Sequence, residues 1–229
     1  MKFVKGTIVN TVSIIAGGSL GVILGHRLSD GLKTTVMQGL SLAVLLIGGQ
    51  MALETNNPPV VIFSLLIGAV IGELLKIETR LNKFGEWIES KFSSEGGSVA
   101  KAFVRTTLIY CVGAMAIMGA IQDGLTGDPS TLYAKSMLDG FSAIAFASTM
   151  GIGVIFSSLP VLLYQGLITL LASSVQAILT PEIIAEMTAT GGLLIIGISI
   201  NILEIAEIKV GNLLPSIFVA IGLSYLIVI

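Results

Sequence analysis

Long apolar runs are the feature that most constrains how this chain can fold. Eight stretches are mostly apolar over about 20 residues, the length that an α-helix needs to cross the hydrocarbon core of a bilayer. Only 11% of the 229 residues are charged, whereas a typical soluble domain has about 25%. The chain is therefore predicted to cross a membrane several times. The predicted spans are 7–26, 33–53, 58–76, 102–121, 140–158, 160–179, 187–204 and 211–229.

The secondary structure of these spans follows from the lipid around them. Backbone N–H and C=O groups in lipid must bond within the protein, so a spanning segment is a helix or part of a closed barrel. The runs are too continuously apolar for barrel strands, in which apolar and polar residues alternate. We predict an all-α fold, a polytopic transmembrane helix bundle that forms a single domain over residues 1–229.

Basic residues gather on one side of this predicted topology. With eight spans, the other side holds only Lys2, Lys5 and Lys135. Because cytoplasmic loops carry the excess of Lys and Arg, both termini are predicted to be extracytoplasmic. The residues on the basic side are Arg27, Lys33, Lys76, Arg80, Lys83, Lys91, Lys101, Arg105 and Lys209.

The longest polar segment, 77–101, faces the cytoplasm in this topology. Its apolar residues, among them Leu81, Phe84 and Trp87, recur with helical spacing. This pattern is typical of an amphipathic helix on the membrane surface. It also fits a helix that packs on the protein, and the pattern favours neither.

Parts of the sequence match one another after a shift of 150 residues. Leu53-Glu54 then coincides with Leu203-Glu204, and the spans of 7–76 overlay those of 160–229. The counterpart of the first span is the sixth, five crossings later, so the two three-helix halves would be upside down relative to each other. We interpret the pattern as an inverted repeat around two central broken helices, an arrangement found in secondary transporters. Chance similarity between apolar segments is the alternative.

Two G-x-x-x-G patterns, Gly21 with Gly25 and Gly68 with Gly72, lie inside predicted spans. Small residues at this spacing let two helix backbones approach closely. We expect these glycine-rich faces to pack against other helices of the same chain. A homodimer that uses the same faces is the alternative.

The polar residues of interest lie mainly between Met115 and Gly166. Asp-Gly pairs at 123–124 and 139–140 are interpreted as the two ends of a connecting loop. Asp139 would then cap the helix that follows, or the two acids would belong to broken helix ends that fold inward and bind an ion or a small polar solute. The predicted binding residues are Gln122, Asp123, Lys135, Asp139 and Gln165, with Asn10 and Asn201 added from the repeat.

Several classes of function are excluded by what the sequence lacks. The net charge of −2 provides no basic field for nucleic acid. One cysteine, Cys111, and one histidine, His26, cannot supply a zinc site. The sequence contains no metalloprotease, phosphate-loop, dinucleotide or nucleophile-elbow motif. We therefore expect no enzyme, no cofactor and no bound metal.

Three stretches of the sequence resemble the domain-of-unknown-function family 554, a family of bacterial inner-membrane proteins. The resemblance covers essentially the whole chain and implies a bacterial plasma-membrane location. Proteins of this family are sometimes described as transporters, and no functional residue is established for them. The stretches are Gly113-x-Met115-x-x-x-Gly119-x-x-Gln122-Asp123-Gly124, Leu132-x-x-Lys135-x-x-x-Asp139-Gly140-Phe141 and Tyr164-Gln165-Gly166.

These observations favour a secondary transporter or channel-like permease for a small ion or polar metabolite. In this hypothesis the acids bind a cation or a proton, and Lys135 neutralises one acid or contacts an anionic group. The alternative is a membrane scaffold or assembly partner that transports nothing, which the glycine-rich faces and the amphipathic segment would also suit.

Overall fold

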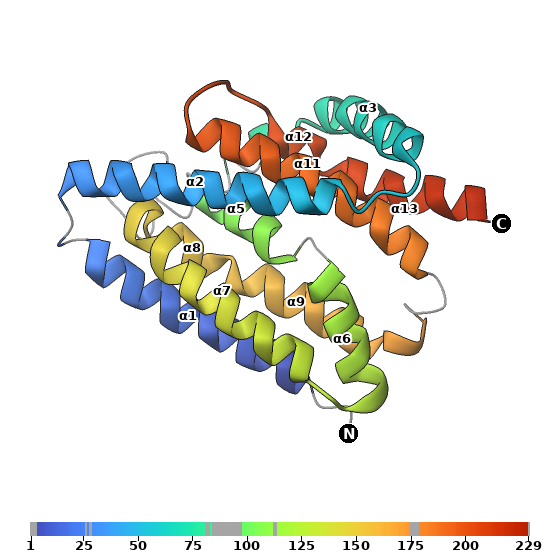
Figure 1. Cartoon of the computed structure of the whole chain (residues 1–229), viewed down its shortest axis with the longest axis horizontal. Helices are drawn as coiled ribbons and strands as arrows, with labels where there is room; N and C mark the ends of the chain where they lie inside the picture. The colour runs from blue at the N-terminus through green and yellow to red at the C-terminus, as the bar shows by residue number, and fades with distance from the viewer. Residues whose placement is uncertain are drawn as a thin grey trace.

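The computed structural model describes residues 4–25, 27, 29–80, 83, 98–111, 114–174 and 179–228. Over these ranges all regular structure is helical and no strand is present, which confirms the all-α prediction (Figure 1). The helices are α1 (Lys5–Gly25), α2 (Asp30–Ala52), α3 (Pro58–Leu75), α5 (Ser98–Cys111), α6 (Ala114–Thr126), α7 (Ser130–Met150), α8 (Gly153–Phe156), α9 (Ser158–Leu170), α11 (Pro181–Ile202), α12 (Val210–Leu213) and α13 (Pro215–Val228).

Local sequence signals set several helix ends. Thr180 precedes α11 in an extended conformation, and its hydroxyl accepts a hydrogen bond from the backbone N–H of Ile183. Helices α3 and α11 each have proline at their first turn, where the missing N–H would have no helical partner. Helix α3 ends at Lys76, which adopts the left-handed conformation common at helix C-termini.

Length and apolar composition qualify six segments of the described chain as membrane spans. Helices α5 and α6, which meet at a bend of 57°, count together as a seventh. The prediction of a multi-pass helical protein is confirmed, whereas the count of eight is not. The six segments are Lys5–Gly25, Thr34–Ala52, Pro58–Leu75, Gly153–Leu170, Pro181–Ile202 and Val210–Ile227.

The predicted loop between the two Asp-Gly pairs is wrong, because α7 already begins at Ser130. Asp139 is therefore a mid-helix residue and does not cap the start of a helix. This segment is helical because Lys135 and Asp139 are four residues apart, and that spacing on a helix brings the two charges together. A segment with two charges that neutralise each other can continue as a helix into the interior of the bundle.

Helices α1 and α7 run parallel and lie side by side (Figure 1). Three glycines of α1, at positions 17, 21 and 25, face the backbone of α7 in order along both helices. A Cβ added at Gly17 would collide with the carbonyl oxygen of Gly140, and one at Gly21 with that of Ile144. This stripe of small residues brings the two helix axes unusually close.

The second glycine motif is also used within the chain. Gly68 and Gly72 of α3 lie directly against Ser216 and Asn212 at the beginning of α13 and in α12. The expected intramolecular packing of both G-x-x-x-G motifs is confirmed. The homodimer remains a prediction, and it would need surfaces other than these two faces.

Three helices of 7–76 run antiparallel to the helices that the sequence repeat assigns as their counterparts. For α2 and α11, Gly48 lies against Gly192, while the Ser199 hydroxyl donates to the carbonyl oxygen of Ser41. The contacts of α3 with α12 and α13 described above show that these helices are antiparallel as well. Along α1, Gly18 faces α8 at Ile155 and residues nearer the N-terminus face the end of α9. This is the geometry expected of inverted halves, although the repeat itself remains a prediction.

A buried carboxylate closes the loop between α2 and α3. Glu186 of α11 is 4% exposed, and its Oε1 accepts hydrogen bonds from the backbone N–H groups of Asn56 (2.7 Å) and Asn57 (2.8 Å). Its Oε2 accepts the hydroxyl of Thr55. We call Glu186 with residues 55–57 the loop cap.

The predicted amphipathic segment 77–101 lies largely outside the described residues.

Candidate functional site

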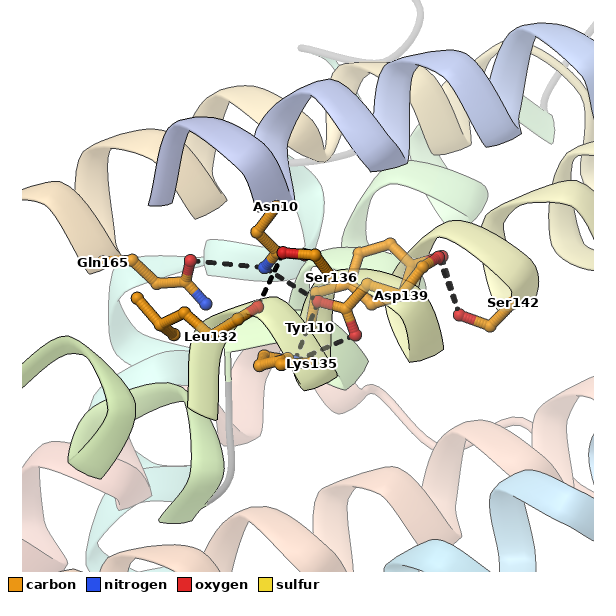
Figure 2. Close-up of polar contacts among 8 residues, drawn as sticks. All are labelled: Asn10, Tyr110, Leu132, Lys135, Ser136, Asp139, Ser142 and Gln165. Atoms are coloured by element: carbon orange, nitrogen blue, oxygen red, sulfur yellow. Dashed lines mark hydrogen bonds and ion pairs between the residues drawn. The ribbon is translucent and has the colours of Figure 1, made fainter. Parts of the chain in front are cut away.

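Four polar residues from three helices meet in the interior of the bundle, between α1, α7 and α9 (Figure 2). The Asn10 Nδ2 donates to the Asp139 Oδ2 at 2.9 Å and to the Gln165 Oε1 at 3.2 Å. The Lys135 Nζ lies 2.9 Å from both carboxylate oxygens of Asp139. None of the four residues is more than 7% exposed. We call Asn10, Lys135, Asp139 and Gln165 the polar cluster.

The close packing of α1 and α7 positions this cluster. Gly17, which contacts Gly140, follows Asn10 by seven residues, close to two helical turns. The short Asn10 side chain therefore projects from the same face of α1 toward Asp139, the neighbour of Gly140 in sequence. With larger residues in the glycine stripe, α1 would be displaced from α7 and Asn10 would not reach the carboxylate.

The ion pair between Lys135 and Asp139 is a costly element of this site. Removing two charges from water costs several kcal/mol each, and their attraction offsets this only with good geometry and further hydrogen bonds. The order of the pair, with the cation N-terminal to the anion, is also the less favourable one on a helix. Helix stability therefore gives little reason for this pair to occur.

The two amides of the polar cluster keep unused hydrogen-bonding capacity. The Asn10 Oδ1 and the Gln165 Nε2 are buried and have no hydrogen-bond partner. One is an acceptor and the other a donor, on side chains that contact each other. The cluster can therefore both accept and donate further hydrogen bonds to a small polar species.

Two further residues, Ser142 and Tyr110, form hydrogen bonds close to Asp139. The Ser142 hydroxyl lies 3.0 Å from the backbone carbonyl oxygen of Asp139 and 3.4 Å from the hydroxyl of Tyr110, which is fully buried in α5. Sequence reasoning did not single out Tyr110, because it stands in an apolar run. Its hydroxyl was the one available signal, since a buried tyrosine O–H usually needs a partner.

Three of the predicted binding residues lie elsewhere. Gln122 braces the connection between α6 and α7 through Asp128 (2.8 Å) and Thr131 (2.7 Å). Asp123 accepts the backbone N–H of Gly6 at 3.1 Å and so caps the beginning of α1. Asn201 closes the turn after α11 with two hydrogen bonds of 2.7 Å to the backbone of Ile208.

The part of the chain that the structure describes contains no group of three or more His, Cys, Asp or Glu side chains that could hold a metal ion. A cavity of about 1120 Å³ opens elsewhere, between the ends of α3 and α11 and the beginning of α5. Glu73, Lys76, Arg105 and Lys209 are among its lining residues, and no member of the polar cluster is.

Comparison with known proteins gives a consistent result for the whole chain. Residues 5–225 match the family model described as "Protein of unknown function (DUF554)". The chain is 34% identical to the uncharacterised membrane protein YdfK of Bacillus subtilis (strain 168), over 93% of each chain. It is 32% identical to the uncharacterised protein YqgA of Escherichia coli (strain K12), over 96% of each chain. None of the solved structures matches it.

Proposed function

The chain belongs to the DUF554 family, and we propose that this membrane protein is a secondary transporter or channel-like permease. Its cargo is a small ion or polar metabolite, bound at the polar cluster. We place it in the bacterial plasma membrane, with both termini extracytoplasmic as the distribution of basic residues favours.

The observation that carries this proposal is the buried ion pair of Lys135 and Asp139 beside two incompletely bonded amides. Ionisable residues within membrane helices are costly and commonly mark ion or substrate pathways. A purely structural cluster would be expected to satisfy its own hydrogen bonds, as the loop cap does with Glu186.

The chemistry of the cluster suggests how a cargo is held. A cation or proton binds at the Asp139 carboxylate and competes with Lys135 for it. An anionic group instead binds at the Lys135 ammonium and competes with Asp139. The amides of Asn10 and Gln165 orient the bound species through hydrogen bonds, since each presents a donor and an acceptor.

The helix arrangement supports the same proposal. Asn10 and Gln165 come from α1 and α9, which are counterparts in the predicted inverted repeat and run antiparallel. In transporters built from inverted repeats, the binding site lies near the interface of the two halves. In the predicted repeat, the contact between these two amides lies at that interface.

The test compares flux into proteoliposomes for the wild type and for a variant that carries both Lys135→Met and Asp139→Leu. Removing both charges avoids leaving one unpaired, so this variant is expected to fold. Over a panel of protons, alkali cations, small carboxylates and amino acids, we expect the wild type to move at least one species. The double variant should lose that flux by at least about tenfold, equivalent to 1.4 kcal/mol of barrier.

Glu186→Gln is the matched control, because it also neutralises a buried carboxylate but lies in the loop cap. It should leave the flux of folded protein unchanged. Equal flux in the wild type and the double variant would refute the binding role of the cluster. No flux of any panel species, together with a stoichiometric protein partner after purification, would favour the scaffold alternative.

A further inference from the structure

Buried polar atoms without hydrogen-bond partners are concentrated along one path through the bundle. Among the nine such atoms in the described residues, five belong to α1, α6 and α9. All five side chains are at most 3% exposed. The atoms are Thr7 Oγ1, Asn10 Oδ1, Asp123 Oδ1, Gln165 Nε2 and Thr169 Oγ1.

Contacts between α1, α6 and α9 bring the segments that carry these five side chains together. Asn10 contacts Gln165 directly, and Thr7 lies on the same face of α1, next to Gly166. One turn farther along α9, the backbone carbonyl of Thr169 lies against Gly124 of α6, the neighbour of Asp123 in sequence. The row therefore begins at the polar cluster and ends near the beginning of α1, where Asp123 of α6 accepts the N–H of Gly6.

The large majority of buried side-chain polar atoms in native proteins bond to protein or to ordered water, so each unpaired atom needs an explanation. A buried water typically makes about three hydrogen bonds to such groups. Five unpaired atoms in sequence along three helices fit a connected set of waters better than five separate defects. The hydroxyls of Thr7 and Thr169 can both donate and accept, and the Gln165 Nε2 donates, so water molecules can bond to all three.

We propose that a row of water molecules connects Asp139 with the bundle end where α1 begins, and that this row conducts protons. The inference rests on the proposed function, because it makes the proton the coupling ion of the transport site. Asp123, Thr7 and Thr169 are positioning residues that hold the waters. Asn10 and Gln165 form the end of the row at the carboxylate.

The proton step balances without a further reactant. A hydronium ion at the Asp123 end gives a proton to the row, successive waters pass one proton each, and a carboxylate oxygen of Asp139 receives it. Asp139 becomes neutral, while Lys135 keeps its own proton and loses its partner. The uncompensated ammonium then provides the driving force for an anionic cargo or for a change of helix packing.

The titratable groups around Asp139 come from two helices. Lys135 lies on its own helix, and Tyr110 and Cys111 approach from α5. Near the other end of the row, Lys5 and Asp128 are the charged residues that act electrostatically on Asp123. The route between the two carboxylates is lined by amides and hydroxyls. These groups do not titrate near neutral pH, but they can hydrogen-bond to the waters that carry the proton.

Water-edited solid-state NMR of threonine-labelled protein in proteoliposomes tests the row directly. Thr7 and Thr169 should receive magnetisation from water at rates typical of hydrated residues, with each signal assigned by its Thr→Val variant. Thr106 and Thr190 are matched controls, because both are fully buried and bond to a carbonyl oxygen of their own helix at 2.8 Å. These controls should stay dry.

The same substitutions test conduction. Thr169→Val removes one hydroxyl at nearly constant volume, and we expect proton flux into liposomes to fall about fivefold, equivalent to roughly 1 kcal/mol at 1.4 kcal/mol per factor of ten. Thr106→Val should leave the flux unchanged. If the Thr169→Val protein does not fold, the Thr7 signal of the wild type, assigned by Thr7→Val, still decides whether the row is hydrated.

The two measurements separate the row from the transport proposal. Water contact at Thr7 and Thr169 without flux of any panel species would support the presence of the waters, but it would overturn proton conduction through them and refute transport. Flux that depends on Asp139, with Thr7 and Thr169 as dry as the controls, would support transport and overturn the row. Dry threonines and no flux would overturn both.

Discussion

Asp139 and Glu186 are both buried carboxylates, but their surroundings differ. Glu186 accepts three hydrogen bonds from residues 55–57, and these donors fix the loop between α2 and α3. Asp139 is bound by a charged side chain of its own helix and by one amide of α1. Beside it, the Asn10 Oδ1 and the Gln165 Nε2 remain unpaired.

The difference shows how a structural carboxylate can be told from a functional one. The partners of Glu186 are mainly backbone N–H groups, which cannot rearrange without moving the chain. The partners of Asp139 are side chains that can change rotamer and exchange a hydrogen bond for one to a cargo. Burial alone does not distinguish these two carboxylates. They differ in the kind of hydrogen-bond partner and in whether unpaired polar atoms lie beside them.

Breaking the ion pair on one side should give the largest loss. Asp139→Ala leaves the Lys135 ammonium buried and unpaired, and we expect a stability loss of about 3–5 kcal/mol. Thermal unfolding in detergent measures this loss. Adding Lys135→Met should restore most of the stability but no transport. Restored transport in that double variant would mean that the pair is only structural.

Removing the carboxylate of the loop cap should cost less. Glu186→Ala leaves three donors near the end of α2 without their acceptor, and we expect a loss of about 2–3 kcal/mol. Flux per folded molecule should stay at the wild-type value. The comparison of the two carboxylates fails if this variant loses flux while its folded fraction is unchanged.

Disturbing the glycine stripe should affect the polar cluster and spare the loop cap. Gly17→Ala places a methyl group against the carbonyl oxygen of Gly140, and overpacking of this kind costs about 1–2 kcal/mol. Because α1 must shift, the contact between Asn10 and Asp139 lengthens and flux falls. Gly39→Ala in α2 is the control, since a Cβ there meets no atom. Equal effects of the two changes on unfolding and flux would contradict this account.

The smallest effect is expected at Asp128, in the connection between α6 and α7. Hydrogen bonds from the backbone N–H and the hydroxyl of Ser130 lower the pKa of Asp128 below its ordinary value, with a further contribution from Gln122. A lowered pKa means that this stabilisation is complete above the unfolded pKa of about 3.9 and disappears as the pH falls through the folded pKa. Between pH 5 and 8 the contribution of Asp128 is therefore constant, and neither stability nor flux should vary with pH because of it.

Measuring stability and flux of the wild type and of Asp128→Asn as a function of pH tests this prediction. The two stability profiles should be parallel over that range and separated by a constant offset, because the variant lacks the stabilisation at every pH above 5. A pH-dependent difference above pH 5 would show that Asp128 has a raised pKa and belongs with the functional acids.

The helical fold was predictable from sequence because apolar runs of spanning length leave the backbone few alternatives. The beginning of α7 was not, because the Asp-Gly pairs and Lys135 resemble turn chemistry until the i,i+4 pairing of Lys135 with Asp139 is considered. Four of the candidate residues meet in space, since polar residues inside spans are rare and must find partners. Asn201 was linked to them only through the repeat, and its side chain instead closes a local turn. The contact of Tyr110 with Ser142 depends on packing between α5 and α7, which no local pattern encodes.

Ligand-dependent stabilisation tests the central claim most directly. The melting temperature is measured over the panel of ions and metabolites for the wild type, for the Lys135→Met, Asp139→Leu double variant and for Glu186→Gln. A species present at 100 times its Kd should stabilise the wild type by about 2.7 kcal/mol, and Glu186→Gln equally. The double variant should show no shift with that species. A shift that persists in the double variant would contradict the assignment of the binding site to the polar cluster.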